Sequence, residues 1–370
     1  MTTPVEASGL PTSDEAWDAF VAADPLGSYL QTSPWGRIKR ANGWRPRRVV
    51  AGTAGGPIGA QLLVRHSGPL PWSFAYAPRG PVAAAWTPDA VAALGDALRQ
   101  AARRGHRLSH VRIEPPVERD GPLDPYGSLR QALVANGWRP APPIQPAASR
   151  IIDLTADEAA LWGDLRSKWR QYVNRARRAS IRVVDAEGDR LPEFYAIYRQ
   201  TAARTGLLIR TEESYRAVWD AFRPLGMARL LFAEDEEGAA QAALFLLRCG
   251  DRVVEPYGGM TAAGASSRAN YLLKWEAIRL SREAGATSYD LWGLVHAGID
   301  QFKAGFGGRE VHYVGAWDLV VDPLGHLATE LGVRARAVYV RQVRARRLRG
   351  ADDGDGAGRQ GAASPPEGEP

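Results

Sequence analysis

Hydrophobic positions recur along the chain with two different periods, which indicates a mixture of helices and strands. A recurrence every three or four residues, typical of amphipathic helices, occurs in seven segments: residues 13–23, 33–40, 88–104, 157–179, 191–205, 211–222 and 269–284. Short apolar runs bounded by turn-forming residues predict strands at 47–51, 59–64, 73–77, 108–113, 151–154, 229–233, 240–248, 252–257 and 288–291. Because strands and helices are interleaved from end to end, the chain is predicted to be an α+β protein.

Two parts of the sequence resemble each other, which predicts a duplicated unit. The hexapeptide ANGWRP occurs at residues 41–46 and again at 135–140, each time after a predicted helix and before an extended segment. The predicted helix and strand on either side of Gly105 also parallel those on either side of Gly285. Internal similarity on this scale indicates two α+β units rather than a solenoid. The proline-rich segment 140–146 separates the two halves.

The composition is that of a globular protein and excludes several classes. Of the 370 residues, 45% are hydrophobic and 24% are charged, and the length suffices for two ordinary domains. The one cysteine, Cys249, cannot form an internal disulfide bond and follows an apolar run that predicts a buried, inert thiol. The sequence has no recognisable signal peptide and no apolar run of the ~20 residues that span a membrane, so we expect a cytoplasmic protein.

The positive charge is concentrated in two segments. The net charge is +6, and residues 166–182 and 334–349 each contain seven cations and no acid. Without these 14 cations, 33 basic residues face 41 acidic ones, so the rest of the chain has a net charge of −8. Such segments attract RNA, nucleotide-linked substrates or an anionic membrane, although solvated helix faces have the same composition. Residues 350–370 are rich in glycine, proline and acids and are predicted to be disordered.

Several catalytic motifs are missing from the sequence, which sets aside the corresponding reactions. The chain has no HExxH, GxSxG or GxxxxGK[ST] motif, so metalloprotease, serine-hydrolase and P-loop chemistry have no support. His106 and His110 are four residues apart, but Gly105 and the predicted strand that follows argue against a shared helical face. No GxGxxG sequence opens a helix after a strand, so a dinucleotide-binding fold is not indicated.

The segment 289–324 combines the features of a ligand-binding loop. Two strand-like runs enclose a turn in which Lys303 is followed by three glycines, Gly305, Gly307 and Gly308. Glycine allows the backbone to approach a ligand closely, and a lysine among glycines supplies a mobile cation. Lysine is rare in this chain and indicates places where a compact point charge is needed. The four lysines are Lys39, Lys168, Lys274 and Lys303.

Six motifs in a fixed order give the sequence a resemblance to a known family. They are SPWGRIK, YAPRGPV, the basic segment 162–179, RTGLLIRTEESY, EPYGG and the segment 289–324. This set resembles the FemABX family of peptidoglycan aminoacyltransferases. The resemblance implies two tandem GNAT-like (acyl-CoA N-acyltransferase-type) domains, with a C-terminal segment returning to the first domain. Because no sustained heptad run occurs, no coiled-coil arm is expected. The expected division is a disordered start (1–12), a first domain (13–147, completed by 325–349), a second domain (148–324) and a disordered tail (350–370).

The resemblance also implies a reaction and its participants. Members of the family transfer an amino acid from aminoacyl-tRNA to an amine of a peptidoglycan precursor, either UDP-MurNAc-peptide or lipid II. Because the aminoacyl ester is already activated, no cofactor is expected. GNAT acetyltransferases hold coenzyme A with a glycine-rich loop before a helix. The corresponding residues 261–268 contain only Gly264, which argues for a donor other than coenzyme A.

The same motifs carry the substrate-binding residues of the family onto this chain. Lys39 and Arg210 would contact the diphosphate of the precursor. Tyr215, Tyr257 and Gly258 would line the groove for its peptide. The alternative interpretation of Tyr257 is a half-buried aromatic residue of a strand, which fits its surroundings nearly as well.

Two residues are expected to take part in the chemistry. Lys303 would lie at the reacting carbonyl and stabilise the developing oxyanion. Asp290 would accept the proton of the attacking amine, although Asp300 suits this role equally well. Apart from the family resemblance, Lys303 would be interpreted as a surface lysine in a turn and Asp290 as a cap at a strand end.

Three other functions remain open. A Fem-like aminoacyltransferase of antibiotic biosynthesis or resistance would share the same motifs. A catalytically inactive protein that binds RNA or an anionic membrane would need only the basic segments. A coenzyme A-dependent N-acetyltransferase would need an intact anion-binding loop before residue 269. The segment 334–349 would contact tRNA or the inner membrane leaflet, or else pack on the first domain.

Overall fold

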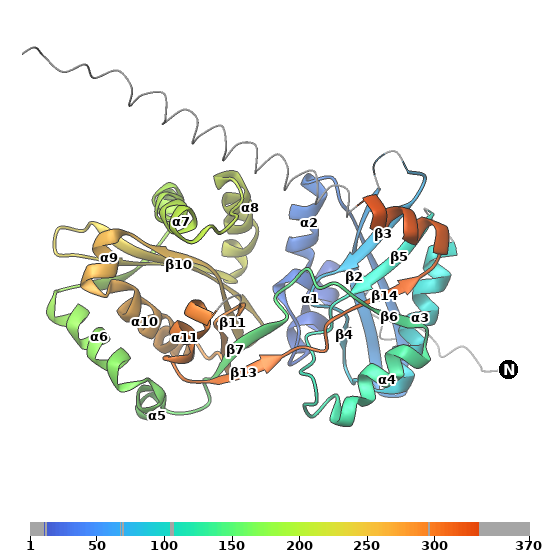
Figure 1. Cartoon of the computed structure of the whole chain (residues 1–370), viewed down its shortest axis with the longest axis horizontal. Coiled ribbons are helices and arrows are strands. Elements are labelled where there is room, and N and C mark those ends of the chain that lie inside the picture. Colours follow the sequence, from blue (N-terminus) through green and yellow to red (C-terminus); the bar gives the residue numbers. More distant parts are fainter. Residues whose placement is uncertain are drawn as a thin grey trace, which may run out of the picture.

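The computed structural model describes residues 11, 13–66, 68, 70–103, 107–294 and 297–332, which form two β-sheets lying side by side (Figure 1). We expected residues 1–12 and 350–370 to be disordered. Apart from Pro11, both ends lie outside the described residues. The basic segment 334–349 also lies outside them. The described helices and strands alternate along the chain, so the α+β class is confirmed.

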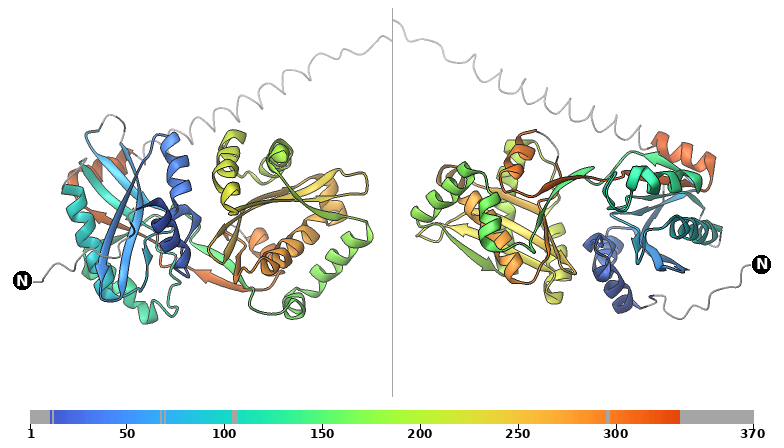
Figure 2. Two further views of the ribbon diagram at one scale, coloured as in Figure 1. Left: turned by 180° about the vertical axis from the view of Figure 1, so that it is seen from behind. Right: turned by 90° about the horizontal axis from the view of Figure 1, so that it is seen from below.

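The first sheet is covered by helices on both faces. On one face, Leu94 and Leu98 of α3 pack against Val111 of the sheet, and α4 lies beside α3. On the other face, α1 and α2 lie between the two sheets (Figures 1 and 2). The helices are α1 (Asp14–Ala23), α2 (Ser33–Ala41), α3 (Pro88–Arg103) and α4 (Ser128–Ala135). The strands are β1 (Arg45–Thr53), β2 (Gly56–His66), β3 (Ser73–Ala77), β4 (Val82–Ala83), β5 (Leu108–Ile113), β6 (Trp138–Ala141) and β14 (Ala316–Val320).

The second sheet is covered in the same way. Helices α7 and α8 lie on the face toward α2, and the remaining helices lie on the opposite face (Figure 1). The helices are α5 (Glu158–Asp164), α6 (Ser167–Arg178), α7 (Leu191–Thr205), α8 (Glu212–Phe222), α9 (Ala262–Ser267), α10 (Ala269–Glu283) and α11 (Ala297–Ala304). The strands are β7 (Ala148–Asp153), β8 (Arg182–Ala186), β9 (Ala228–Glu234), β10 (Ala240–Cys249), β11 (Arg252–Met260), β12 (Ser288–Asp290) and β13 (Arg309–His312).

Both sheets share one arrangement of strands. The first has the order β1-β2-β3-β5-β14-β6 with β4 beside β2, and the second has the order β8-β9-β10-β11-β12-β7-β13. Among the described strands, each sheet has one parallel pair, β3 with β5 and β11 with β12, and each pair is joined through a helix. The place that β7 takes in the second sheet is taken in the first by β14. The C-terminal segment therefore returns to the first sheet, and it does so at β14, earlier than the predicted residue 325.

A continuous apolar core joins the two units. Trp17 and Trp35 from the first unit belong to the same buried cluster as Phe222 and Phe245 from the second. The ring of Tyr29 stands edge-on to that of Phe222, with 5.9 Å between their centroids. Burial of large aromatic side chains contributes strongly to stability, so the two units are held as one body along this contact.

The predicted helix at residues 157–179 is wrong as a single element. It is divided into α5 and α6, because Leu165 and Arg166 are extended. The amide of Arg166 donates a hydrogen bond to the carbonyl oxygen of Gly305 (2.9 Å), and a Cβ on Gly307 would meet Asp164. The glycine turn that follows α11 therefore packs into the break, which local periodicity cannot reveal.

Three further expectations about local structure need correction. Lys303 lies in the last turn of α11 and not in a turn between strands. Residues 261–268 are not an open loop, because most of them form the short helix α9. The two ANGWRP copies do not mark two units, because they lead into β1 and β6, both in the first sheet. They share a local helix end, in which Asn42 and Asn136 each donate to the carbonyl four residues earlier (2.9 Å).

Candidate active site

A small pocket between α2 and α8 brings together four of the residues expected to bind substrate. It is lined by Lys39 from α2, Arg210 from the segment before α8, Tyr215 from α8, and Tyr257 from β11. These residues are far apart in the sequence and meet because the aromatic core holds α2 against α8. The pocket thus lies at the junction of the two units. The remaining lining residues are Trp35, Ile38, Asn42, Ser214 and Val218.

Lys39 is a buried cation without an acidic partner among the described residues. Its side chain is 8% exposed, and its ammonium group lies 4.3 Å from the centre of the Trp35 ring. Burial and, to a smaller extent, the positive charge of Arg210 together lower the pKa of Lys39 to about 8. Two cations that converge without a carboxylate form a site that an anion would stabilise.

Arg210 is positioned through its backbone, which leaves its guanidinium group for a ligand. The Arg210 amide donates to the hydroxyl of Tyr215 (3.1 Å), and the hydroxyl of Tyr195 donates to the Arg210 carbonyl oxygen (3.2 Å). Within the described part of the chain, its guanidinium has neither a carboxylate nor a hydrogen-bond acceptor. Tyr215 in turn stands edge-on to Tyr257, with 5.0 Å between ring centroids.

A larger cavity of about 270 Å³ lies next to this pocket. It is lined from both units, by Tyr29 and Arg79 of the first and by Asp290 and Trp292 of the second. The hydroxyl groups of Tyr29 and Tyr257 share a hydrogen bond. Because Tyr29 lines the cavity and Tyr257 lines the pocket, this bond connects the two spaces.

Arg79 forms one wall of the cavity. Its guanidinium lies 4.0 Å from the ring centre of Tyr313 and 5.2 Å from that of Trp292, and it donates to the carbonyl oxygen of Pro146 (2.9 Å). Its side chain is 4% exposed, and it contributes a favourable positive charge to Asp290. Arg79 lies in the motif YAPRGPV, but nothing in the local sequence distinguishes it from the other arginines, so no role was predicted for it.

Asp290 and Lys303 both hold the turn at Trp292. This residue has a positive φ of 54°, which a bulky side chain rarely adopts. Its amide donates to Asp290 (2.7 Å), and Ser149 donates to the same carboxylate oxygen. From the other side, the Lys303 ammonium donates to the carbonyl oxygens of Trp292 and Gly293 (2.6 Å for Gly293). The two residues predicted to be catalytic therefore meet at one turn.

Burial shifts the pKa values of Lys303 and Asp290 away from those of the same groups at a protein surface. Burial lowers the pKa of Lys303 to about 8, with a further contribution from the charge of Lys274. Burial also raises the pKa of Asp290, against the opposing effect of its hydrogen bonds with Ser149 and Trp292. Asp290 lines the cavity, whereas Lys303 lies behind the Trp292 turn. Within the described part of the chain, two of the three ammonium protons of Lys303 have acceptors.

A buried ion pair lies beside Lys303. Lys274 of α10 pairs with Glu255 of β11, and the hydroxyl of Tyr289 donates to the second carboxylate oxygen of Glu255 (2.8 Å). β11 pairs with β12 only through residues 252–254, so Glu255 lies where the two strands separate. Lys274 is one of the four lysines of the chain, and its pairing with Glu255 could not be predicted from the sequence.

The two remaining candidates are placed differently. Gly258 is on β11 beside Tyr257, and a Cβ at this position would lie 2.5 Å from the side chain of Leu244. The space that Gly258 leaves is therefore filled by the core. Asp300, the alternative base, is on α11, and its Oδ1 is buried without a hydrogen-bond partner in the part of the chain that the structure describes.

Comparison with known proteins agrees with this architecture. The model of the FemAB family matches residues 12–120, and the model of the acetyltransferase (GNAT) domain matches residues 163–304. The lipid II:glycine glycyltransferase of Staphylococcus saprophyticus is 24% identical over 383 residues, covering 84% of this chain and 92% of that protein. The enzyme of the same name from Staphylococcus aureus MRSA252 is 27% identical over 227 residues, covering 60% of this chain and about half, 54%, of that protein.

Solved structures show the same fold. The crystal structure of FemX superimposes with a TM-score of 0.79 at 21% identity, covering 86% of this chain and 99% of FemX. The structure of L-PGS from Bacillus licheniformis gives a TM-score of 0.52 at 14% identity, covering 88% of this chain and 98% of that chain.

The two sheets with their matched strand order and the two family models define a tandem acyltransferase of the GNAT fold. In sequence and in fold, the chain is similar to the FemABX family. The predicted fold, with a C-terminal segment that returns to the first unit, is confirmed. None of the described helices combines the length and the apolar character that crossing a membrane requires.

Proposed function

We propose that this enzyme transfers an amino acid from aminoacyl-tRNA to an amine of a peptidoglycan precursor and so contributes to cell-wall cross-bridges. Its similarity to the FemABX family and to lipid II:glycine glycyltransferases supports this reaction class. The observation that carries the proposal is the convergence of Lys39 and Arg210 in one pocket without a carboxylate partner among the described residues. UDP-MurNAc-peptide and lipid II both carry a diphosphate, which is the anion that this pair suits.

The diphosphate assignment rests on charge and shape. A phosphate oxygen can accept hydrogen bonds from an ammonium and a guanidinium group together, and such charge-assisted bonds are stronger than neutral ones. Tyr215 and Tyr257 offer aromatic surfaces beside the two cations, and Tyr257 leads through Tyr29 into the larger cavity. With the diphosphate at the pocket, the attached peptide extends toward the cavity.

The cavity supplies the groups that acyl transfer needs. The acceptor nitrogen attacks the ester carbonyl of the aminoacyl-tRNA, a C–N bond forms, the C–O bond to the tRNA ribose breaks, and the ribose oxygen leaves as a hydroxyl. The amine proton passes to Asp290 and from there to the leaving oxygen. Arg79 of the cavity wall stabilises the developing oxyanion with its positive charge, and Lys303 adds its own charge from behind the Trp292 turn.

A basic helix provides a surface for the tRNA donor. Arg175, Arg177 and Arg178 lie on the exposed side of α6, whereas Val173 and Ala176 face the core. Only Arg177 among these three arginines has an acidic partner within the described residues, Glu276 (3.0 Å). Phosphate contacts of this kind weaken steeply with salt. We expect the enzyme to act in the cytoplasm, with peripheral contact to the inner leaflet if its acceptor is lipid II.

An assay with purified components tests the proposal. Charged tRNA carrying a radiolabelled amino acid is incubated with the enzyme and either UDP-MurNAc-pentapeptide or lipid II, and label on the stem peptide is measured. Transfer should require charged tRNA and should fall strongly in the Lys39→Met and Arg210→Met variants. Absence of label on both precursors with every aminoacyl-tRNA tried would overturn the assignment.

A further inference from the structure

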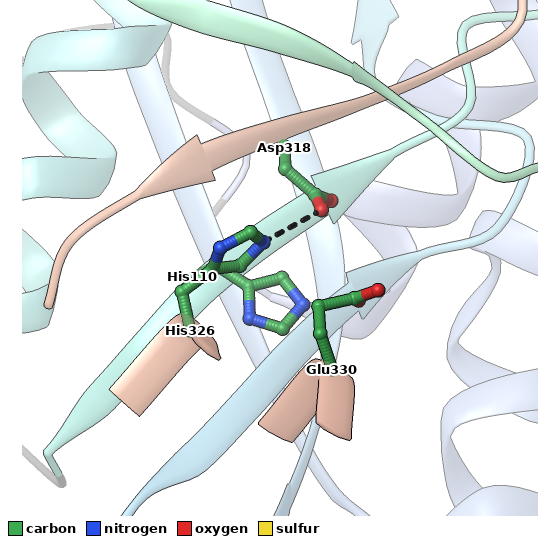
Figure 3. A group of neighbouring side chains, drawn as sticks. All are labelled: His110, Asp318, His326 and Glu330. Atoms are coloured by element: carbon green, nitrogen blue, oxygen red, sulfur yellow. Dashed lines mark hydrogen bonds and ion pairs between the residues drawn. The ribbon is translucent and has the colours of Figure 1, made fainter. Parts of the chain in front are cut away.

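A cluster of metal-ligating side chains lies in the first unit, outside the active site. His110 of β5, Asp318 of β14 and two residues of the helix at 323–332, His326 and Glu330, point toward one another (Figure 3). One ligand atom from each residue can be chosen so that all four lie within 4.8 Å of one another. None of these residues lines the pocket or the cavity described above. We propose that this cluster is a binding site for a divalent transition-metal ion such as Zn²⁺.

The fold delivers the four residues to one place. In the antiparallel pair of β5 and β14, Val320 is opposite His110 and Asp318 is opposite Arg112, so these side chains share one face of the sheet. Asp322 caps the following helix, accepting a hydrogen bond from the Gly325 amide (2.9 Å). His326 and Glu330 are four residues apart, which places both on the side of the helix that faces the sheet.

The hydrogen bonds of His110 leave a lone pair directed at the cluster. Its ring is 2% exposed, and its Nδ1 lies 3.0 Å from the hydroxyl of Ser109. That hydroxyl donates its own proton to the carbonyl oxygen of Ser73 (3.1 Å), so it accepts from Nδ1–H. His110 therefore presents an unprotonated Nε2, for which the described residues supply no donor. A metal-binding histidine is typically held in this way, with its second nitrogen bonded to a protein acceptor.

Arg112 orients the carboxylates of Asp318 and Glu330 but does not use all of their lone pairs. It donates two hydrogen bonds to Asp318 (2.7 Å each) and one to Oε1 of Glu330 (3.0 Å). Oε2 of Glu330 accepts no hydrogen bond from the described residues, and Oδ1 of Asp318 keeps a second lone pair. Nε2 of His326 lies 3.3 Å from Oδ2 of Asp318 (Figure 3), a contact that a metal ion bound between the two groups would replace. With both imidazoles neutral, two carboxylates and one guanidinium leave a net charge of −1, which a metal dication would counter.

The chemistry of the donors selects the kind of metal. Two imidazoles with two carboxylates suit zinc and neighbouring transition metals better than calcium or magnesium, which prefer oxygen ligands alone. Zinc bonds of about 2.0–2.2 Å require neighbouring ligand atoms about 3.3 Å apart, so the most distant ligand atoms, now within 4.8 Å, would approach by up to about 1.5 Å on binding. His326 and Glu330 are partly exposed, with side-chain exposures of 25% and 21%, and give the ion access.

Direct metal binding to the full-length, tag-free protein tests this site. After treatment with EDTA and transfer to metal-free buffer, the protein is titrated with Co²⁺ while the visible absorption is followed, and Zn²⁺ is then added in competition. One Co²⁺ per chain should bind with the intense bands of a four- or five-coordinate ion and be displaced by Zn²⁺. His326→Ala and Glu330→Gln should each weaken binding by about 10- to 100-fold.

A matched pair elsewhere serves as the control. His312 and Glu310 of β13 form an exposed pair with 2.8 Å between His312 Nε2 and the carboxylate, but no further histidine, cysteine or carboxylate of the described residues completes a metal-ligand group there. His312→Ala should leave the affinity for Co²⁺ unchanged. In the unaltered protein, Zn²⁺ should protect His326 but not His312 from modification by diethyl pyrocarbonate, so the test does not depend on the folding of any variant. Absence of Co²⁺ binding, equal binding by His326→Ala and the unaltered protein, or modification of His326 unaffected by Zn²⁺ would each overturn the proposal.

Discussion

Two buried lysines of this enzyme are held in opposite ways. Lys274, in the second unit, is 5% exposed and is paired with the carboxylate of Glu255. Lys39, at the junction of the units, is 8% exposed and has no carboxylate partner among the described residues, where its ammonium faces the Trp35 ring and the like charge of Arg210. The two residues are equally buried, so burial alone does not separate a structural cation from a binding one. The difference lies in whether the fold itself supplies the counter-charge.

This difference has an energetic meaning. A buried ion pair recovers much of the cost of removing its charges from water, whereas an unpaired buried cation keeps that cost in the free protein. Burial lowers the pKa of Lys39 to about 8 for this reason. A ligand that supplies two negative charges would relieve the cost, so the arrangement at Lys39 favours the bound state. Substitutions at the two lysines should therefore affect different properties.

Lys274→Met should produce the largest effect, on stability. It leaves Glu255 buried without its partner, which is expected to lower the free energy of unfolding by about 3–5 kcal/mol. Urea denaturation followed by circular dichroism measures this change. Lys168→Met, at an exposed position on α6, is the control and should change it by less than about 0.5 kcal/mol. Equal stability of the two variants would mean that the Lys274–Glu255 pair does not hold the second unit together.

Lys303→Met should reduce turnover most strongly among the site variants. Loss of one donor to a developing oxyanion typically lowers kcat by about 10²–10³-fold. The KM for the precursor should change little, because Lys303 lies behind the Trp292 turn and away from the Lys39 pocket. Steady-state kinetics with charged tRNA check this. If the variant kept a near-normal kcat, the role of Lys303 would be limited to holding the Trp292 turn.

Lys39→Met should act on binding and not on folding. Loss of a hydrogen bond to a charged group costs about 1.5–3 kcal/mol, so the KM for the precursor should rise by about 10- to 100-fold. The free energy of unfolding should stay the same or increase, because an unpaired buried cation is removed. The comparison with Lys274→Met is then direct. A loss of stability in Lys39→Met similar to that of Lys274→Met would show that Lys39 has a structural role.

The pH dependence should show the smallest effect. The unfolded chain holds the Lys39 proton up to about pH 10.5, whereas the folded enzyme releases it near pH 8. In this window the unfolded state binds more protons, so the free energy of unfolding should rise with pH between about 8 and 10.5. Affinity for the precursor should fall over the same range as the cation is lost. The Lys39→Arg variant should retain its affinity for the precursor above pH 8. If the affinity of the variant and that of the unaltered enzyme fell equally with pH, the loss could not be assigned to Lys39.

Much of the fold can be predicted from local sequence. The strand at residues 73–77 and the helix at 191–205 were predicted with the observed bounds. Both can be recognised locally, the strand as a short apolar run and the helix from the spacing of its hydrophobic residues. The break at Leu165 could not be predicted, since it depends on a glycine turn about 140 residues later in the chain. The return of β14 to the first sheet was expected through the family resemblance, but periodicity did not indicate where it occurs.

The candidate site shows a similar division. Lys39, Arg210, Tyr215 and Tyr257 were assigned by motif, and they line one pocket. By contrast, Arg79 is one of 43 arginines, and only the packed structure places it against Trp292 and Tyr313. The cluster at His110 was equally hidden, because its partners lie more than 200 residues away and no short spacing marks them. His106, the neighbour considered from the sequence, lies outside the described residues.

The most direct test of the central claim is the affinity of the free enzyme for diphosphate-bearing precursors, measured by isothermal titration calorimetry. UDP-MurNAc-pentapeptide and a short-chain analogue of lipid II are each titrated into the unaltered enzyme, Lys39→Met/Arg210→Met and the control Lys168→Met. If the two unpaired cations bind the diphosphate, the double variant should lose at least about 100-fold in affinity for the preferred precursor, and the control should lose none. Undiminished affinity of the double variant for that precursor would contradict the account.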